Sequence, residues 1–351
     1  MLRLRAGLWA IGGIIIAQVL APARDLEFID EQSLPPSVFY EKTRIGGLSG
    51  ITYDASQDRY FLVSDTKDRG GSQIFLAKIP TSESGLGPIE WTGMLTLKNS
   101  DRSSRAALDA EGIALENRGR FFVSYEGNRS TPSGIASFGR KSGNELFQLP
   151  LPEVFVTGDQ KGMQPNHGLE SLTTAGPDRR WLFTTSESPL YQDAIPGADP
   201  YRGPLRLLRY DLKPRKIAAP EQRAYRMESD AVYTSVPDVL ALDERRLLVL
   251  ERQLVNSQPP RARRIRIYEV DFDQKTATDV ASLDSLSGEK IRPLKKTLLF
   301  DSDRTPIPQL DNIEAMCLGP ALGSDRSIVL VSDDNFNKTQ RTQFLLLRLK
   351  E

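Results

Sequence analysis

The chain has 351 residues, of which 46 are Lys or Arg and 46 are Asp or Glu, so its formal net charge is zero. This balance argues against a nucleic-acid-binding protein, which carries a basic surface. One cysteine, Cys317, and one histidine, His167, exclude a disulfide framework, a thiolate zinc site and a histidine-rich metal centre. Chemistry in this chain therefore has to come mainly from carboxylates, Arg, Lys and the backbone.

The first 23 residues have the features of an export signal. Arg3 and Arg5 give a positive start, residues 7–20 form an apolar run, and residues 21–23 (Ala-Pro-Ala) are small where signal peptidase cleaves. The run is short for a membrane-spanning helix, which needs about 20 residues, although an uncleaved anchor is an alternative. We expect a signal peptide over residues 1–23, a periplasmic or secreted mature protein, and no membrane span within it.

The rest of the chain repeats one pattern five times. A strand-like run that begins with an acid or Ser is followed by a turn and by a second run that ends in an acid. The copies pair SGITYD with FLVSD, EGIAL with FVSYE, ESLTT with FTTSE, DVLAL with LLVLE, and EAMCL with VLVSD. Their first residues lie between 59 and 76 residues apart. Internal repetition at this period indicates a repeat architecture.

Most copies continue with two further strand-like runs, such as residues 73–79 and 89–97 in the first copy. These runs are rich in β-branched and aromatic residues. Four strands in a unit of about 65 residues are typical of a β-propeller blade. We predict an all-β protein in which residues 24–351 form a single β-propeller domain. A two-sheet sandwich is the alternative.

The last copy has only three strand-like runs before the chain ends. Residues 26–29 supply a fourth, and their pairing with the last copy would close the ring and remove exposed edges. The count is then five blades. Six blades remain an alternative, because the stretch from Thr276 to Pro293 is long enough to hold extra strands.

The repeated acids are the main candidates for function. The start of one strand and the end of the next lie at the same end of an antiparallel hairpin, so the acids should surround one mouth of the central channel. The expected pairs are Glu111 with Glu126, Glu170 with Glu187, Asp238 with Glu251, and Glu314 with Asp333. So many carboxylates repel one another unless they are paired or bind a metal.

A ring of carboxylates can supply the roughly six to eight oxygen ligands that Ca²⁺ takes. The predicted metal ligands are Glu111, Glu126, Glu170, Glu187, Glu314 and Asp333. Neutral oxygens come from Asn128, Asn166, Asn312 and Asn335, which lie beside the same strand ends. The alternative is structural: the acids cap turns or pair with Arg side chains of the neighbouring blade.

Basic residues follow the second acids and are candidates for binding a phosphate or carboxylate group of the substrate. They are Arg69, Arg129, Arg252 and Lys338, and the alternative is that they are solvated surface residues. His167 precedes Glu170 by three residues, at the rim of the same mouth. We predict Glu111, Glu170 and His167 as catalytic residues, with His167 in acid–base chemistry. The alternative for His167 is a hydrogen-bonded loop imidazole.

As a set, several segments resemble the phytase-like family, described by the "esterase-like activity of phytase". They are GGLSGITYD with RYFLVSD, DAEGIAL with GRFFVSYEGN, HGLESLT, and DNIEAMCLGP with IVLVSDDNFN, within a likeness that spans roughly Arg44 to Leu349. The resemblance implies an exported β-propeller and calcium-dependent ester or phosphoester hydrolysis. The acid set carries over from it, whereas the lysine-rich substrate motifs of alkaline β-propeller phytases have no match here.

The sequence therefore predicts an exported, calcium-dependent propeller hydrolase, monomeric, that acts on a small anionic or ester substrate. Its reaction would be hydrolysis of a phosphoester or a carboxylic ester. One alternative is a gluconolactonase-like lactonase, and another is a non-catalytic propeller that binds a ligand or protein partner. Three or more ring carboxylates around one point would favour the hydrolase, whereas acids each paired with an Arg would favour the binding protein.

Overall fold

The computed structural model describes residues 24–35, 37–65, 71–103, 108–126, 132–214, 216–256, 262–305, 307 and 309–350. The expected signal peptide lies outside these residues. Within them, no helix has the length and apolar character needed to cross a membrane.

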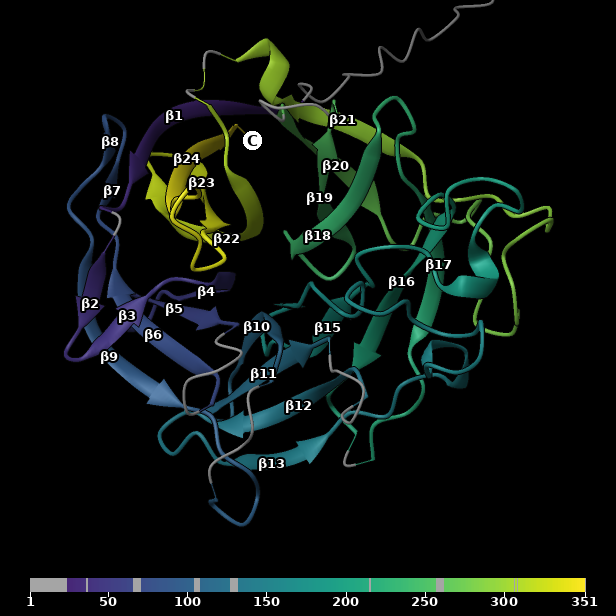
Figure 1. Ribbon diagram of the computed structural model, residues 1–351, viewed down its shortest axis with the longest axis horizontal. Coiled ribbons are helices and arrows are strands. Elements are labelled where there is room, and N and C mark those ends of the chain that lie inside the picture. Colours follow the sequence, from purple (N-terminus) through teal and green to yellow (C-terminus); the bar gives the residue numbers. More distant parts are fainter. Residues whose placement is uncertain are drawn as a thin grey trace, which may run out of the picture.

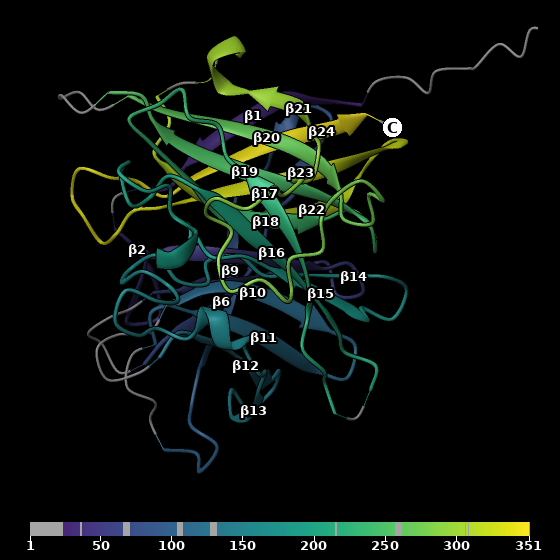
Figure 2. The same cartoon turned by 90° about the vertical axis from the view of Figure 1, so that its right-hand side faces the viewer.

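Five antiparallel sheets of four strands each are arranged as a ring (Figures 1 and 2). Blades 1 and 2 are formed by β4 (Leu48–Asp54), β5 (Arg59–Ser64), β6 (Gln73–Lys78) and β9 (Glu90–Thr96), and by β10 (Ala110–Glu116), β11 (Arg120–Tyr125), β12 (Gly134–Gly139) and β13 (Glu145–Gln148). Blade 3 is formed by β14 (Thr173–Ala175), β15 (Trp181–Thr184), β16 (Pro204–Asp211) and β17 (Glu221–Arg226). Blade 4 is formed by β18 (Tyr233–Ala241), β19 (Arg246–Leu254), β20 (Arg263–Asp271) and β21 (Lys296–Asp301). Blade 5 is formed by β22 (Asn312–Leu322), β23 (Asp325–Asp333), β24 (Gln343–Lys350) and β1 (Asp25–Ser33).

The remaining elements are short. They are the hairpins β2 (Val38–Tyr40) with β3 (Thr43–Ile45) and β7 (Thr81–Ser82) with β8 (Gly85–Leu86), and the 3₁₀ helices η1 (Glu153–Phe155), η2 (Tyr191–Asp193) and η3 (Ser302–Arg304). The predicted five-bladed propeller is thus confirmed. The sixth blade was wrong as an alternative, because residues 276–293 contain no strand.

The N-terminal strand closes the ring, as predicted. Strand β1 pairs antiparallel with β24, with Leu26 opposite Leu349 and Gln32 opposite Phe344. Leu26 is buried in the same hydrophobic cluster as Leu250 and Leu330, which belong to blades 4 and 5. The pairing joins the two ends of the described chain in one blade, in which β1 is the strand farthest from the innermost strand β22.

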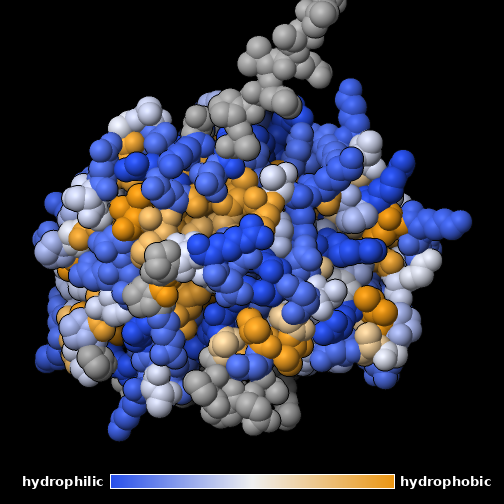
Figure 3. Space-filling model, turned by 90° about the horizontal axis from the view of Figure 1, so that it is seen from above, coloured by the Kyte–Doolittle hydropathy of each residue, from blue (hydrophilic) through white to orange (hydrophobic). Residues whose placement is uncertain are grey.

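The hydrophobic core lies between adjacent blades. Each sheet alternates side chains toward its two faces, so it contributes apolar residues to both of its neighbours. Phe61 and Val63 pack with Phe121 between blades 1 and 2, while Leu62 packs with Leu346 between blades 1 and 5. The face seen in Figure 3 is largely hydrophilic, with hydrophobic residues gathered in separate patches.

Strands β4, β10, β14, β18 and β22 are innermost, and each contacts its neighbours in the ring. In blades 1 and 2 the inner strands approach closely at a glycine near the start of the strand, Gly50 and Gly112. A Cβ atom on Gly112 would lie 2.6 Å from the carbonyl oxygen of Glu170 and 2.8 Å from the Cβ atom of Leu172. The small residues that the repeat shows at this position are therefore needed for the inner strands to meet.

We expect Gly112→Ala to lower the free energy of unfolding by about 1–3 kcal/mol, because the added methyl group overpacks a contact made by backbone. Urea unfolding measures the loss. Gly158→Ala is the control, since its nearest neighbour would be the Lys161 Cβ atom at 3.8 Å. Equal stability of the two variants would contradict the close-approach explanation.

Candidate functional site

One mouth of the channel forms a cavity of about 270 Å³. Its described lining residues include seven carboxylates, one guanidinium and one imidazole. They are Ser49, Asp65, Glu111, Glu126, Asn166, His167, Glu170, Glu187, Tyr233, Arg252, Asn312, Glu314, Asp333 and Asn335. All six predicted metal ligands lie here, together with His167 and Arg252. The roles assigned to them stay predictions.

Strand register explains how the repeat positions these side chains at the channel mouth. The small residue of the inner strand pairs with a residue of the second strand, as Ala315 does with Val331. One acid directly precedes the small residue, and the other follows its partner by two positions, which gives Glu314 and Asp333. The register shifts between Ile313 and Ala315, so Glu314 lies in a β-bulge, which interrupts the strict alternation of the strand and lets its side chain reach the mouth beside Asp333.

Blade 4 departs from this arrangement, and the expected pair of Asp238 with Glu251 was wrong. Asp238 pairs with Leu250, so it occupies the small-residue position rather than the acid position. Pro237 and Arg252 consequently take the places that acids hold in the other blades. A cation thus replaces one member of the carboxylate ring.

The two acids of blade 4 have structural contacts instead. The Asp238 carboxylate accepts hydrogen bonds from the backbone N–H groups of Val239 (2.8 Å) and Met316 (2.7 Å), which links β18 to β22. Burial raises its pKa well above the usual value. Glu251 is fully buried within blade 4, where it accepts hydrogen bonds from Tyr225 Oη and Lys296 Nζ, both at 2.6 Å.

Arg252 bridges two of the ring acids. Its Nη2 atom donates to Glu187 at 2.7 Å, and its Nη1 atom donates to Glu314 at 2.5 Å and to Asn312 at 2.9 Å. Burial acts to lower the pKa of the guanidinium, but the charges of Glu314 and Glu187 raise it overall. Arg252 is therefore a fixed positive charge on one side of the mouth.

His167 lies on the same side and is also held by Glu187. Its Nδ1 atom is 2.6 Å from Glu187 Oε2, and the Tyr233 hydroxyl is 3.3 Å from the same nitrogen. The Tyr201 ring packs at 4.4 Å from the imidazole. Burial acts to raise the pKa of Glu187, but the hydrogen bond from His167 and the charge of Arg252 lower it. Glu187 is thus the ionised acid that positions both groups.

Four other acids of the mouth are not held by Arg252 or His167. Among the described residues, no Lys or Arg forms a salt bridge with Glu111, Glu126, Glu170 or Asp333. Ligand oxygens of Asp109, Glu111 and Glu126 lie within 4.8 Å of one another, as do those of Glu126, Glu170 and Glu187. Glu126 also accepts a hydrogen bond from the Gly168 N–H at 2.8 Å, which fixes its carboxylate.

The crowding of these carboxylates raises their pKa values. Burial, and then the neighbouring charge of Glu126, raises the pKa of Glu111 well above the usual value. Burial and the charge of Glu111 do the same to the pKa of Glu170. Burial and the charge of Glu314 raise the pKa of Asp333. These acids oppose ionisation unless a cation joins them.

The other predicted residues fall elsewhere. Lys338 is exposed and does not line the mouth cavity, while Arg69, Arg129 and Asn128 lie outside the described residues. Sequence reasoning missed Asp109 and Tyr233 as members of the site. Asp109 is part of the DAEG segment, but it lies outside the repeated pattern. Tyr233 comes from the first residue of β18, ahead of the part that repeats.

The sequence profile described as "Esterase-like activity of phytase" matches residues 43–336. The chain belongs to the phytase-like family. No curated protein matches it. Solved structures of glycoside hydrolases are among those that resemble this phytase-like chain, at low identity.

An exo-β-1,3-galactanase from Clostridium thermocellum is 10% identical, with a TM-score of 0.49 and coverage of 92% of this chain and 63% of that one. An α-L-arabinofuranosidase from Clostridium thermocellum is 11% identical, with a TM-score of 0.41 and 80% coverage of both chains. An α-L-arabinanase from Cellvibrio cellulosa is 9% identical, with a TM-score of 0.43 and coverage of 88% and 93%. These identities and TM-scores are too low to transfer an activity.

The donor set of this phytase-like mouth fits a hard divalent cation. Ca²⁺ prefers carboxylate and amide oxygens, and the mouth offers both, with Asn166, Asn312 and Asn335 beside the acids. Of the two groups of three acids within metal-binding distance, Asp109 with Glu111 and Glu126 is the one that does not contain Glu187, which Arg252 already engages.

Proposed function

We propose that this phytase-like protein is an exported, calcium-dependent hydrolase that cleaves a phosphoester or carboxylic ester at the channel mouth. The observation that carries the proposal is the division of the mouth into two parts. One part gathers the buried carboxylates of Glu111, Glu126, Glu170 and Asp333, with which no described Lys or Arg forms a salt bridge, and the other holds Arg252 and His167 on Glu187. Export rests on residues 1–23 acting as a signal peptide.

Glu111 and Glu126, with Asp109, would hold the ion. A bound Ca²⁺ would supply positive charge that attracts an ester oxygen and makes a nearby water more acidic. Glu170 and Asp333 line the same mouth and would add negative charge that favours a divalent over a monovalent cation.

The chain's own groups supply the remaining functions of a hydrolase. Arg252 is held at both nitrogens by Glu187 and Glu314, so its charge is fixed where negative charge on a reacting ester would develop. Glu187 engages the Nδ1 atom of His167, which leaves Nε2 as the ring nitrogen for taking a proton from water. A gluconolactonase-like lactonase would use the same groups on a cyclic ester.

A second candidate is a non-catalytic propeller that binds a ligand or protein. It is favoured by Arg252, which pairs with two ring acids as a structural cation would. The geometry therefore supports each candidate in part. Two acids are paired with an Arg, as in the binding protein, and three other acids lie within metal-binding distance of one another, as in the hydrolase.

Thermal unfolding of the mature protein in EDTA and then in millimolar Ca²⁺ tests the proposal. An ion that binds only the folded state stabilises it by about 3 kcal/mol at 100 times its dissociation constant, so we expect a clear rise in Tm. Glu111→Gln should abolish the rise. Glu90→Gln, which removes an exposed carboxylate on the outer strand β9, should preserve it.

A Tm that does not respond to Ca²⁺ would contradict the calcium-dependent hydrolase. The next experiment would then be a search for a bound partner. A rise that depends on Glu111 would justify a screen of phosphate and carboxylic esters, in which hydrolysis should be lost in EDTA.

A further inference from the structure

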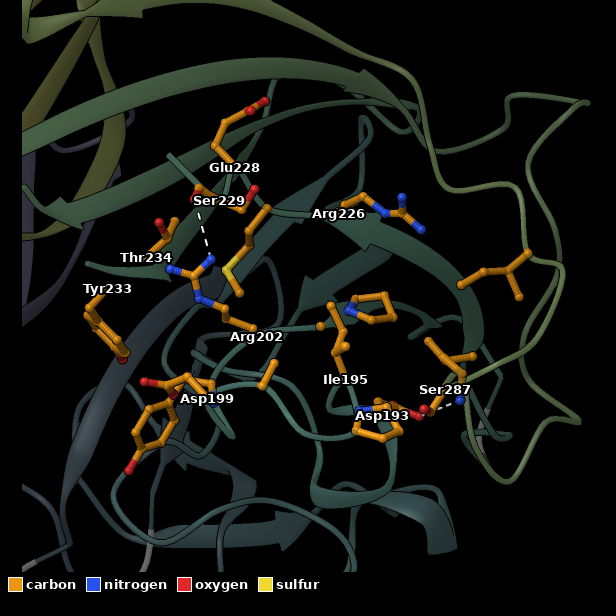
Figure 4. Close-up of a pocket in the computed structure, with 18 of the residues that line it drawn as sticks. Asp193, Ile195, Asp199, Arg202, Arg226, Glu228, Ser229, Tyr233, Thr234 and Ser287 are labelled. Carbon is orange, nitrogen blue, oxygen red and sulfur yellow. Dashed lines mark hydrogen bonds between the residues drawn. The ribbon is translucent and has the colours of Figure 1, made fainter. Parts of the chain in front are cut away.

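A second cavity, which we call the side cavity, adjoins the mouth between blades 3 and 4 (Figure 4). Its volume is about 510 Å³, within the usual range for a small-molecule site. Residues 193–204, 226–234 and 286–291 contribute its walls. Tyr233 lines both cavities, so the two meet at this side chain.

Two tyrosines form the boundary with the mouth. The Tyr201 ring lies 4.4 Å from the His167 ring and 5.6 Å from the Tyr233 ring, which it meets edge to face. The Tyr233 hydroxyl reaches the Nδ1 atom of His167 at 3.3 Å. A molecule in the side cavity would therefore lie against rings that directly contact the predicted acid–base residue.

The side cavity differs from the mouth in chemistry. Its apolar lining includes Ile195, Met227, Val232 and Ile291. Ile195 and Val232 are 51% and 49% exposed, so both present apolar surface to this cavity. The Arg202 guanidinium at this site donates to the backbone carbonyl groups of Ser229 and Ala231, so its charge serves to hold the wall.

The far wall is rigidly built. Asp193 and Arg206 form a salt bridge in which both side chains are 0% exposed, with Arg206 Nε 2.7 Å from Asp193 Oδ2. Arg206 also donates to the carbonyl oxygen of Leu283 at 2.9 Å, and Asp193 accepts from the Leu286 N–H at 2.7 Å. These contacts attach residues 283–286 to blade 3 and preform the cavity.

We infer that the side cavity binds an uncharged apolar group, aryl or branched alkyl, of a carboxylic ester whose ester bond lies at the mouth. The inference rests on the proposed hydrolase function and names its substrate class. A polyanionic phosphoester has no apolar group to place here, so it would gain nothing from this cavity, whereas an apolar arm would be stabilised by burial against Ile195 and Tyr233.

The kcat/KM values of ethyl acetate and 2-phenylethyl acetate, measured as acid release in the presence of Ca²⁺, test the inference. Both are acetate esters of primary alcohols, and the second carries a phenyl group as its apolar arm. We expect about tenfold higher kcat/KM for the phenylethyl ester. Ile195→Trp places an indole in the cavity and should reduce this preference to about onefold.

Leu146→Trp is the matched control, because Leu146 is 50% exposed on the outer strand β13 and distant in the fold from this cavity. It should keep the full preference. Equal kcat/KM values for the two esters, or a preference that survives Ile195→Trp, would overturn the inference.

A binding measurement separates this inference from the hydrolase proposal. The amides N-(2-phenylethyl)acetamide and N-ethylacetamide replace the esters and are titrated by saturation-transfer NMR. We expect about tenfold tighter binding of the phenylethyl amide, lost in Ile195→Trp and retained in Leu146→Trp. Equal binding would overturn the side-cavity assignment. Selective binding without hydrolysis of either ester would retain the assignment of the cavity and contradict the hydrolase.

Discussion

In EDTA, the free energy of unfolding is expected to fall as the pH rises from about 5 to about 8. Burial and neighbouring carboxylates raise the folded-state pKa values of Glu111, Glu170 and Asp333 well above those of exposed acids. The folded protein therefore holds protons that the unfolded chain releases above pH 4.5. Each such proton lowers stability by about 1.4 kcal/mol per pH unit until the folded group also ionises.

Glu187 has the opposite effect on stability. Its pKa is lower in the folded protein than in the unfolded chain, so its ionised carboxylate stabilises the fold at higher pH, and this stabilisation is lost as the pH falls. The raised groups outnumber it, since burial raises the pKa values of Glu126 and Glu314 as well. A net loss of about 3 kcal/mol or more across the interval is the expected result. Saturating Ca²⁺ should remove most of this loss, because metal ligands bind in the deprotonated form.

Urea unfolding at several pH values, with EDTA or with Ca²⁺, measures the dependence. Glu111→Gln should flatten the decline in EDTA by removing one proton-binding group, and Glu90→Gln on the outer strand should leave it unchanged. If stability in EDTA is constant or rises with pH, the crowded carboxylates do not titrate as their burial requires.

The fold was predictable because short local sequence patterns define the repeat. Alternating apolar runs define each hairpin, and in four of the five repeats a small residue after the first position marks the contact between blades, as Gly112 does against Glu170. The closing strand followed from counting, since the last copy lacked one strand and residues 26–29 supplied it. None of these signals depends on contacts between distant segments.

The composition of the ring was harder to predict at blade 4. A shift of one residue in a strand reverses the face that a side chain occupies. Asp238 resembles the first acids in sequence, but the register places it at the small-residue position, with Arg252 rather than Glu251 facing the mouth. The Glu-Arg sequence at the end of β19 leaves both assignments open until the register is known.

The side cavity had no signal in the sequence. Its walls come from irregular segments, among them residues 283–288 and the turn that contains η2, which have no strand or helix periodicity. Their positions depend on the buried pair of Asp193 and Arg206, which lie on different elements. A charged residue in a loop gives no local indication that it will be buried, because the contacts that bury it are tertiary.

We expect Arg206→Met to lower the free energy of unfolding by about 3–5 kcal/mol, because it leaves the fully buried Asp193 carboxylate without its counter-ion. Urea unfolding at neutral pH measures the loss. Arg245→Met is the matched control: Arg245 pairs with Asp271, but their side chains are 55% and 42% exposed, and exposed pairs contribute only about 0–1 kcal/mol.

The double variant Asp193→Leu with Arg206→Met decides whether charge or packing dominates. Removal of both charges eliminates the unpaired carboxylate, so the double variant should be more stable than Arg206→Met alone. A double variant that is less stable by the sum of the two single losses would mean that the hydrogen bonds to Leu283 and Leu286, rather than the ion pair, hold the wall of the side cavity. Comparable losses in Arg206→Met and Arg245→Met would contradict the buried pair as a main source of stability.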